Sequence, residues 1–194
     1  MIAPQSVCVY CGSSTGNDPR YREAAASLGR AIAAQGLKLV FGGGGVGLMG
    51  VVCDAVLENG GYVIGIIPGF LRAREAHRGG LSELHVVESM HERKQMMFER
   101  SDAFVILPGG FGTLDETFEI VTWRQLELHD KPVLLVNVDG YWDPLLAMIE
   151  RQIEEGFLRP QYRGLLRVVD RAEDVVPALL EAPPAKRPDK PQRI

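Results

Sequence analysis

The stretch AFVILPGGFGTLDETFE, residues 103–119, passes from an apolar segment through three glycines into an acidic segment. The residue types at 103–107 predict a buried strand, because β-branched and aromatic side chains suit a pleated, buried surface. Gly109, Gly110 and Gly112 predict a tight turn, and the residues that follow predict a helix. A glycine turn between a strand and a helix is a common phosphate site, since helix N-termini attract anions.

Similar apolar runs recur along the chain and alternate with segments of helical spacing. This alternation is typical of βαβ units, so we expect an α/β fold, a single-domain, doubly wound, Rossmann-like parallel sheet with helices on both faces. The strands are predicted at 5–10, 37–42, 62–67, 84–87, 103–107, 133–138 and 166–169. Helices are predicted between most of them, including 18–35, 142–155 and 171–181.

The chain of 194 residues fits one domain, which we place at residues 1–182. Residues 183–194 contain four prolines that alternate with charged residues. Such a segment cannot bury enough apolar area to order itself, so we predict a disordered tail there.

Composition excludes several classes of protein. With 46% apolar and 24% charged residues, the chain is typical of a soluble globular protein. No apolar run approaches the roughly 18 residues of a membrane span, and the first residues do not have the pattern of a secretory leader, so we expect no membrane association and a cytoplasmic location. The net charge of −4 offers no basic surface for nucleic acid.

Three cysteines form too sparse a set for a disulfide framework. Cys8 and Cys11 have the C-x-x-C spacing of a redox pair, but they lie in an apolar run and two small buried hydrophobes are the alternative. A redox pair normally opens a helix, whereas here a glycine and serines follow, so we favour the buried alternative.

Ligands of doubly wound sheets bind outside the carboxyl ends of the strands, so the loops after the strands are the places to search. After the first predicted strand, Gly12, Ser13 and Ser14 offer backbone N–H groups and hydroxyls that suit an anion. A plain turn is the alternative, because glycine and serine are common in turns.

The second loop, GGGGVGLMG at 42–50, contains a G-x-G-x-x-G pattern, which alone is a weak sign of dinucleotide binding. The next strand does not end in the acidic residue that would hold a ribose, and the loop lacks the lysine of an ATP-binding P-loop. A mononucleotide phosphate therefore fits this loop better than NAD or ATP.

Thr113 is predicted to be the N-cap of the helix that follows the third loop. With Glu116 it forms a capping box, which is the structural alternative to a functional role for that glutamate. A carboxylate in the first helical turn is expected to stay ionised, so Glu116 would suit the stabilisation of positive charge or the orientation of water, and would be a poor proton donor. Arg93 and Lys94, in MHERK at 90–94, could face the same site, and a solvated charged helix face is their alternative.

Together these motifs resemble the Lonely Guy (LOG) family of cytokinin riboside 5′-monophosphate phosphoribohydrolases, long labelled lysine decarboxylases. The family pattern P-G-G-x-G-T-x-x-E is met from Pro108 to Glu116, and M-x-x-R-K from Met90 to Lys94. The resemblance also covers CGSS, the second glycine loop, and the segment TWRQLELHDKPVLLVNVDGYWDPLL.

The resemblance implies hydrolysis of the N-glycosidic bond of an adenosine 5′-monophosphate, including N6-modified ones, to a free base (a cytokinin) and ribose 5-phosphate. It implies a homodimer with sites near the subunit interface, and no metal or organic cofactor. Arg93 and Glu116 would be the catalytic pair. From the loops and the resemblance together, the residues expected to contact the substrate are Gly12, Ser13, Ser14, Gly43, Gly44, Gly45, Gly47, Glu75, Lys94, Gly109, Gly110, Phe111, Gly112, Thr113, Leu114, Asp115 and Thr122.

Two other functions are consistent with parts of the sequence. A non-catalytic nucleotide-binding or carrier protein would use the same glycine loops, but would have little need for Arg93 and Glu116. An amino acid decarboxylase would need a lysine that binds pyridoxal phosphate and a larger scaffold, and Lys38, Lys94 and Lys131 have no obvious cofactor setting.

Overall fold

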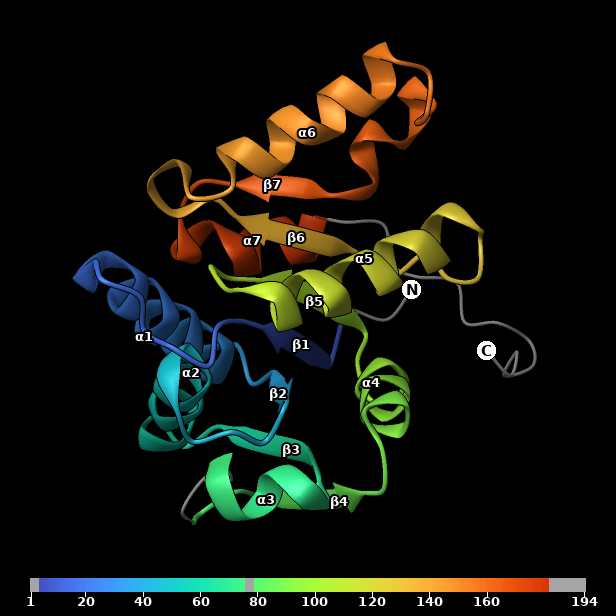
Figure 1. Ribbon diagram of the computed structural model, residues 1–194. Coiled ribbons are helices and arrows are strands. Elements are labelled where there is room, and N and C mark those ends of the chain that lie inside the picture. The colour runs from blue at the N-terminus through green and yellow to red at the C-terminus, as the bar shows by residue number, and fades with distance from the viewer. Residues whose placement is uncertain (1–3, 76–78, 182–194) are drawn as a thin grey trace.

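The computed structural model describes residues 4–75 and 79–181, which form a seven-stranded sheet with every pairing parallel (Figure 1). The strands are β1 (Ser6–Tyr10), β2 (Lys38–Phe41), β3 (Tyr62–Pro68), β4 (Glu83–Val87), β5 (Ala103–Ile106), β6 (Val133–Val136) and β7 (Arg167–Val169). Each lies within two residues of its predicted position, so the predicted α/β fold is confirmed.

Helices connect these strands. They are α1 (Pro19–Ala34), α2 (Gly47–Glu58), α3 (Gly69–Glu75), α4 (Met90–Glu99), α5 (Phe111–Gln125), α6 (Asp143–Glu154) and α7 (Val175–Glu181), with 3₁₀ turns η1 (Val138–Gly140), η2 (Pro160–Leu165) and η3 (Ala172–Asp174). In the described part of the chain, no helix combines the length and apolar character needed to cross a bilayer.

The strand order is β4-β3-β2-β1-β5-β6-β7, so the chain builds outward from β1 in one direction and then returns to place β5 on the other side of β1. The loops that leave β1 and β5 therefore diverge. This reversal creates a crevice at the carboxyl ends of the two strands, which is the usual ligand position in a doubly wound sheet.

The sheet is buried on both faces. Helices α1, α2 and α7 cover one face, and α4, α5 and α6 cover the other (Figure 1). Along β1, Val7 and Val9 face the first layer, while Cys8 and Tyr10 face the second. Burial of both faces explains why the inner strands β1, β2, β3, β5 and β6 are nearly continuous apolar runs, whereas the edge strands β4 and β7 are partly exposed.

The two cysteines of the C-x-x-C pattern lie in different layers, Cys8 with α4 to α6 and Cys11 with α1 and α2. Both are free and buried, and burial raises the pKa of each thiol above its ordinary value. They behave as small hydrophobic side chains, because a redox pair needs accessible thiolates.

The helix predicted at 171–181 is wrong at its beginning. The chain first forms the 3₁₀ turn η3, and α7 starts at Val175. In a helix that began at 171, Pro177 would lie in the interior, where a residue with an N–H would donate to the carbonyl of Glu173 and proline cannot. In α7 as it forms, Pro177 lies in the first turn, where proline is tolerated. The predicted disordered tail at 183–194 lies outside the described residues, and the domain boundary at 182 stays a prediction.

Candidate functional site

The loops after β1, β2 and β5 meet at Gly12. Its N–H donates to the carbonyl of Pro108 at 3.0 Å, and its carbonyl accepts from the N–H of Leu48 at 3.0 Å. Two backbone hydrogen bonds thus fasten all three glycine loops together at the crevice beside β1. The three loops that the sequence analysis singled out thus lie together.

Gly47 shows how closely the first two loops pack. Its φ is +60°, a conformation that residues with a side chain rarely adopt. A Cβ at this position would lie 2.2 Å from the carbonyl carbon of Ser13 and 2.3 Å from the nitrogen of Ser14. Any other residue would therefore push the second loop away from the first.

A cavity of about 270 Å³ lies at this junction. Residues 12–16, Tyr21, Leu48, residues 108–110 and Tyr141 line it. The predicted residues Gly12, Ser13, Ser14, Gly109 and Gly110 are thus brought to one cavity.

Two helices begin at this cavity without a side-chain cap. The N-caps are Val46 for α2, whose apolar side chain cannot accept a hydrogen bond, and Gly110 for α5, which has no side chain. By contrast, Asp18 caps α1 and Ser89 caps α4, each with a side-chain oxygen. The uncapped starts leave backbone N–H groups and the positive ends of two helix dipoles available to an anion.

Thr113 is not the N-cap, so this prediction is wrong. The helix starts two residues earlier at Phe111, and Thr113 is buried in its first turn, where its carbonyl accepts a 2.6 Å hydrogen bond from the hydroxyl of Thr117. The helix begins earlier because Thr113 packs in the core as part of the first turn. Glu116 therefore lies in the second turn and cannot form a capping box.

Arg93 of α4 and Glu116 of α5 face each other across the second layer, with 3.8 Å between Nη2 and Oε1. Only 10% of each side chain is exposed. The guanidinium also donates from Nη2 to the carbonyl of Gly42 at 3.3 Å and from Nη1 to Sδ of Met90 at 3.7 Å. Within residues 4–75 and 79–181, its Nε is buried without a hydrogen-bond partner. Arg93 is thus no part of a solvated face.

Gly42 makes room for Arg93. A Cβ at Gly42 would lie 1.7 Å from Nη2 and 2.8 Å from Cζ of the arginine. The guanidinium can therefore reach the carboxyl end of β2 only because position 42 has no side chain. The sequence analysis placed Gly42 in the second loop without giving it this role.

Glu116 is not held ionised by the helix dipole, contrary to the sequence-based expectation. Burial raises its pKa to about 7, and Arg93 and Lys94 only partly oppose this. Glu116 can therefore take up and release a proton near neutral pH, which suits a general acid or base.

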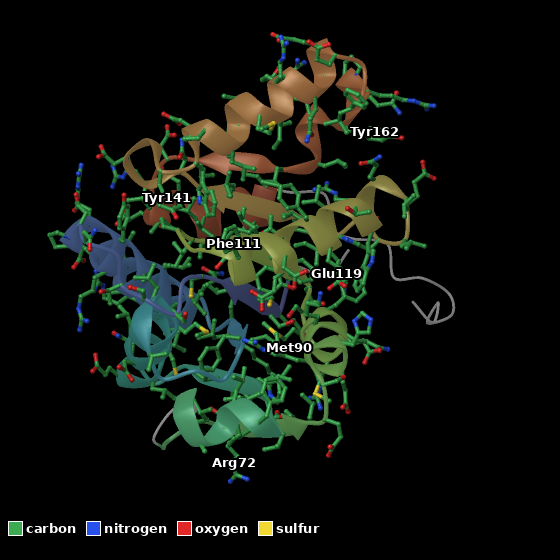
Figure 2. All side chains as sticks on the ribbon, in the orientation of Figure 1. Arg72, Met90, Phe111, Glu119, Tyr141 and Tyr162 are labelled. Atoms are coloured by element: carbon green, nitrogen blue, oxygen red, sulfur yellow. The ribbon has the colours of Figure 1, made fainter. Side chains whose placement is uncertain are left out.

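Lys94 lies between two carboxylates of α5, with 3.1 Å from Nζ to Asp115 and 3.1 Å to Glu119. Burial alone would lower its pKa, but the hydrogen bonds to Asp115 and Glu119 outweigh this and leave the pKa raised. Figure 2 labels Met90 on α4 and Glu119 on α5, the two helices that carry these contacts. The ammonium thus links α4 to α5 next to Glu116.

The remaining predicted residues are not all brought to the cavity. Gly43, Gly44 and Gly45 lie in the loop after β2, and Glu75 is the last residue of α3. In α5, Leu114 is half-buried, whereas Phe111, Gly112 and Thr122 are exposed. Their predicted contacts with a substrate, like the roles of Arg93 and Glu116, stay predictions.

Three residues near the site were missed by the sequence analysis. They are Gly42, Glu119 and Tyr141, whose hydroxyl donates to the carbonyl of Gly109 at 2.7 Å. A search of the loop after β6, which also lies at the carboxyl edge of the sheet, would have found Tyr141. The sequence indicates Glu119 less clearly: the only sign is that it lies about one helical turn after Glu116, on the same side of the predicted helix.

The fold and the site define a doubly wound α/β protein with a crevice at its topological switch point, two helix starts without a side-chain cap at that crevice, and a buried arginine–glutamate pair. A family described as "Possible lysine decarboxylase" matches residues 49–179. "Probable cytokinin riboside 5′-monophosphate phosphoribohydrolase LOGL2" of Oryza sativa subsp. japonica is 47% identical over 178 residues, 92% of this chain and 73% of that protein. "Cytokinin riboside 5′-monophosphate phosphoribohydrolase LOG3" of Arabidopsis thaliana is 47% identical over 92% of this chain and 83% of its own. The chain belongs to the Lonely Guy (LOG) family.

Solved structures share the fold at lower identity. The molybdenum cofactor binding protein from Rippkaea orientalis has a TM-score of 0.69 and 22% identity, covering 92% of this chain and 96% of that one. The molybdenum cofactor carrier protein from Chlamydomonas reinhardtii has a TM-score of 0.67 and 20% identity, covering 90% of this chain and 94% of that one. At these identities, they show the fold alone.

Proposed function

We propose that the protein hydrolyses the N-glycosidic bond of adenosine 5′-monophosphates, including N6-modified ones, to the free base and ribose 5-phosphate. The observation that carries the proposal is the buried Arg93–Glu116 pair beside two uncapped helix starts. The names of the LOG relatives, which are 47% identical, support the same reaction.

The 5′-phosphate is assigned to the cavity at the three glycine loops, where backbone N–H groups and the Ser13 and Ser14 hydroxyls can donate to its oxygens. The space over Gly110 and Gly112 supports this assignment. Apart from the chain neighbours and the helix's own backbone, no atom of the described residues lies within 4 Å of a Cβ added to either glycine, and neither has a positive φ. Packing of the protein alone therefore does not require glycine there, whereas a closely bound phosphate would.

The sugar is assigned to the side of the cavity toward Glu116. Cleavage passes through an oxocarbenium-like state with positive charge at C1′, and an ionised Glu116 stabilises that charge. The base leaves with the electron pair of the glycosidic bond and takes up a proton from solvent. A water molecule adds its hydroxyl to C1′ and gives its other proton to Glu116, which then releases that proton to solvent, so the protons balance over the turnover. The pKa of about 7 allows Glu116 to make this exchange at neutral pH.

Arg93 keeps part of the Glu116 population ionised, because its charge opposes the effect of burial on the pKa. Its second role is to hold the carboxylate in place, since Gly42 and Met90 fix the guanidinium from the other side. Hydrolysis by this pair requires water alone. A carrier protein would gain nothing from burying this pair, whose desolvation costs stability.

The direct test is to incubate the purified protein with AMP, N6-isopentenyl-AMP and adenosine and to measure the free base by chromatography. We expect base to be released from both monophosphates, with kcat/KM for AMP about tenfold or more above that for adenosine, because remote phosphate binding also orients the sugar. Equal efficiency on AMP and adenosine would contradict the phosphate assignment, and no release from either would exclude the reaction.

A homodimer is part of the proposal, because α5 carries an exposed apolar stripe. Phe111, Phe118 and Leu126 have exposed fractions of 92%, 43% and 61%, and their spacing places them with Thr122 on one helix face. If a second copy of the chain covered this stripe, Phe111 and Thr122 would lie at the subunit interface. The resemblance implies that the substrate sites are near this interface, so both residues could then make their predicted substrate contacts.

Light scattering is expected to give the mass of a dimer, and Phe118→Asp is expected to give a monomer, because it places a charge in the apolar contact. Phe157→Asp is the matched control, since Phe157 is 88% exposed but follows α6, away from the stripe. A monomeric wild-type protein, or a dimeric Phe118→Asp variant, would contradict the assignment of this face.

A further inference from the structure

The loop after β6 reaches over the edge of the sheet to the glycine turn after β5. The hydroxyl of Tyr141 donates to the carbonyl of Gly109 at 2.7 Å, and the ring packs edge-on against Tyr21 at 5.4 Å between centroids. Both tyrosines line the cavity assigned to the phosphate. A second ring contact, with Trp142 at 4.7 Å, anchors Tyr141 to the core.

The backbone that presents Tyr141 is strained. Asp139 has a φ of +51°, which is uncommon for a residue with a side chain, and Gly140 follows with a φ of +75°. Asn137 holds the turn from within, because its side-chain oxygen accepts from the N–H of Trp142 at 2.7 Å and its amide donates to Asp143 at 2.7 Å. A strained turn persists only where its surroundings hold it in place.

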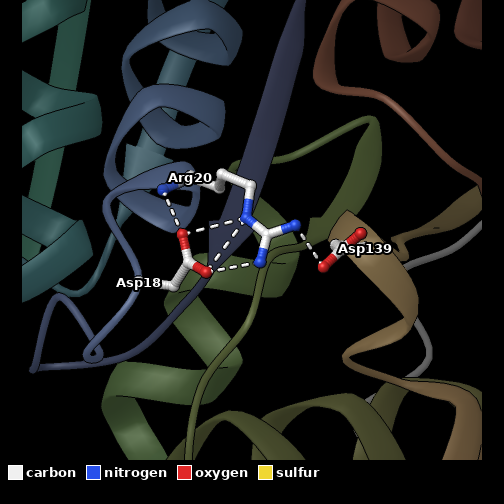
Figure 3. A network of polar contacts seen from close by, with 3 residues as sticks. All are labelled: Asp18, Arg20 and Asp139. Carbon is white, nitrogen blue, oxygen red and sulfur yellow. Dashed lines mark hydrogen bonds and ion pairs between the residues drawn. The ribbon is translucent and has the colours of Figure 1, made fainter.

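Arg20 at the start of α1 stabilises the strained turn from outside. Its guanidinium bridges Asp18, the N-cap of α1, and Asp139 of the strained turn (Figure 3). The neighbouring residue Tyr21 is the one that contacts the Tyr141 ring. Thus the first turn of α1 touches the β6 loop at two points, one ionic and one aromatic.

We propose that Tyr141 is a positioning residue for the phosphate turn: its hydroxyl fixes the peptide between Gly109 and Gly110, and the Arg20–Asp139 pair holds Tyr141 in place. This inference rests on the proposed function.

The peptide between two glycines turns over easily, because neither has a Cβ to restrict it. In a trans peptide, the carbonyl of Gly109 and the N–H of Gly110 point in opposite directions. Gly110 is the N-cap of α5. When the carbonyl of Gly109 points toward Tyr141, the N–H of Gly110 must point away from Tyr141, so it can join the free N–H groups of the helix start as a donor to the anion. A reversed peptide would offer an anion a carbonyl oxygen in place of a donor, and would weaken its binding.

A partly exposed hydroxyl can bond to water equally well in the unfolded chain, so this hydrogen bond adds little to stability. Its consequence should be seen in ligand binding. Tyr141→Phe keeps the ring and its contacts and removes only the hydroxyl, and Tyr162→Phe on η2, after the far end of α6, is the matched control (Figure 2).

The experiment measures Kd for AMP and adenosine by calorimetry, with each tyrosine variant combined with Glu116→Gln to prevent turnover, alongside kcat and KM of the single variants. We expect Tyr141→Phe to weaken AMP binding about tenfold, since one hydrogen bond to a charged group is typically worth that much, and to leave adenosine binding and the melting temperature unchanged. Asp139→Asn should weaken AMP binding in the same direction and by less. Tyr162→Phe should change neither ligand's Kd.

Unchanged AMP binding in Tyr141→Phe would overturn the inference, as would an equal loss for AMP and adenosine, which would indicate a general structural role. If the wild-type protein binds AMP but does not hydrolyse it, the proposed reaction fails while the comparison of Kd values still decides the role of Tyr141. Absence of AMP binding to the wild-type protein would overturn both.

Discussion

Glu116→Gln is expected to lower kcat for AMP by a hundredfold or more, because the amide keeps the shape of the carboxylate but can neither carry the charge that faces C1′ nor accept a proton. Steady-state release of adenine measures the loss. Glu154→Gln, an exposed position on α6, is the matched control and should retain wild-type turnover. If Glu116→Gln retained turnover, the glutamate would have no catalytic role.

The pH dependence follows from the pKa of about 7. The wild-type kcat/KM should rise with pH through about 7 and level off above it, because the ionised form is the active one. The residual activity of Glu116→Gln should lack this rise. A wild-type profile that falls through neutral pH would instead show that protonated Glu116 is the active form.

Stability should change in the opposite direction. The folded pKa of Glu116 is raised from its ordinary value of 4.5 to about 7, so the stabilisation from its neutral form is complete below about 4.5 and lost as the pH rises to about 7. Relative to Glu116→Gln, the wild-type free energy of unfolding should fall over that range by at most about 3 kcal/mol, at 1.36 kcal/mol per unit. Denaturant unfolding at pH 5 and pH 8 measures this difference. A constant difference would mean that the pKa of Glu116 is ordinary.

Arg93→Ala is the second large loss that we expect, on the order of a hundredfold or more in kcat/KM, since it removes a preorganised charge from the site. The pKa of Glu116 should rise further without the opposing charge, so residual activity should shift to higher pH. Arg100→Ala is the control, because Arg100 is the C-cap of the same helix, is exposed and pairs with Glu83 at 3.4 Å. Equal effects of the two substitutions would refute a special role for Arg93.

Gly42→Ala tests the same site without removing any charge. Its methyl group would overlap the guanidinium of Arg93, so we expect a loss of kcat/KM similar to that of Arg93→Ala. Gly164→Ala is the matched control, because the described structure leaves open space for a Cβ there and its φ is not positive. Full activity of Gly42→Ala would show that Arg93 acts from another position.

The fold could be predicted from local patterns because the inner strands are buried on both faces and therefore read as nearly uninterrupted apolar runs. Its seven strands were found in this way. The beginning of α5 could not be predicted in this way, because Gly110 and Thr113 are both acceptable N-caps. Only the packing of Thr113 in the core decides between them. The 3₁₀ turn before α7 was missed because Pro177 disfavours a helix by its effect on the carbonyl of Glu173, four residues earlier, and the sequence analysis did not consider this effect.

The sequence alone determined that three glycine loops follow strands and that a glutamate and an arginine lie near them, because residue type and spacing are local properties. Only the tertiary structure decided that Glu116 titrates near pH 7, since its pKa depends on how completely the second helix layer excludes water. The contact of Arg93 with Gly42, 51 residues away, likewise exists only once α4 packs against the sheet. The hydrogen bond from Tyr141 to Gly109, 32 residues away, forms only because β6 lies next to β5. Such contacts between distant segments arise from the packing of whole elements, which no local pattern specifies.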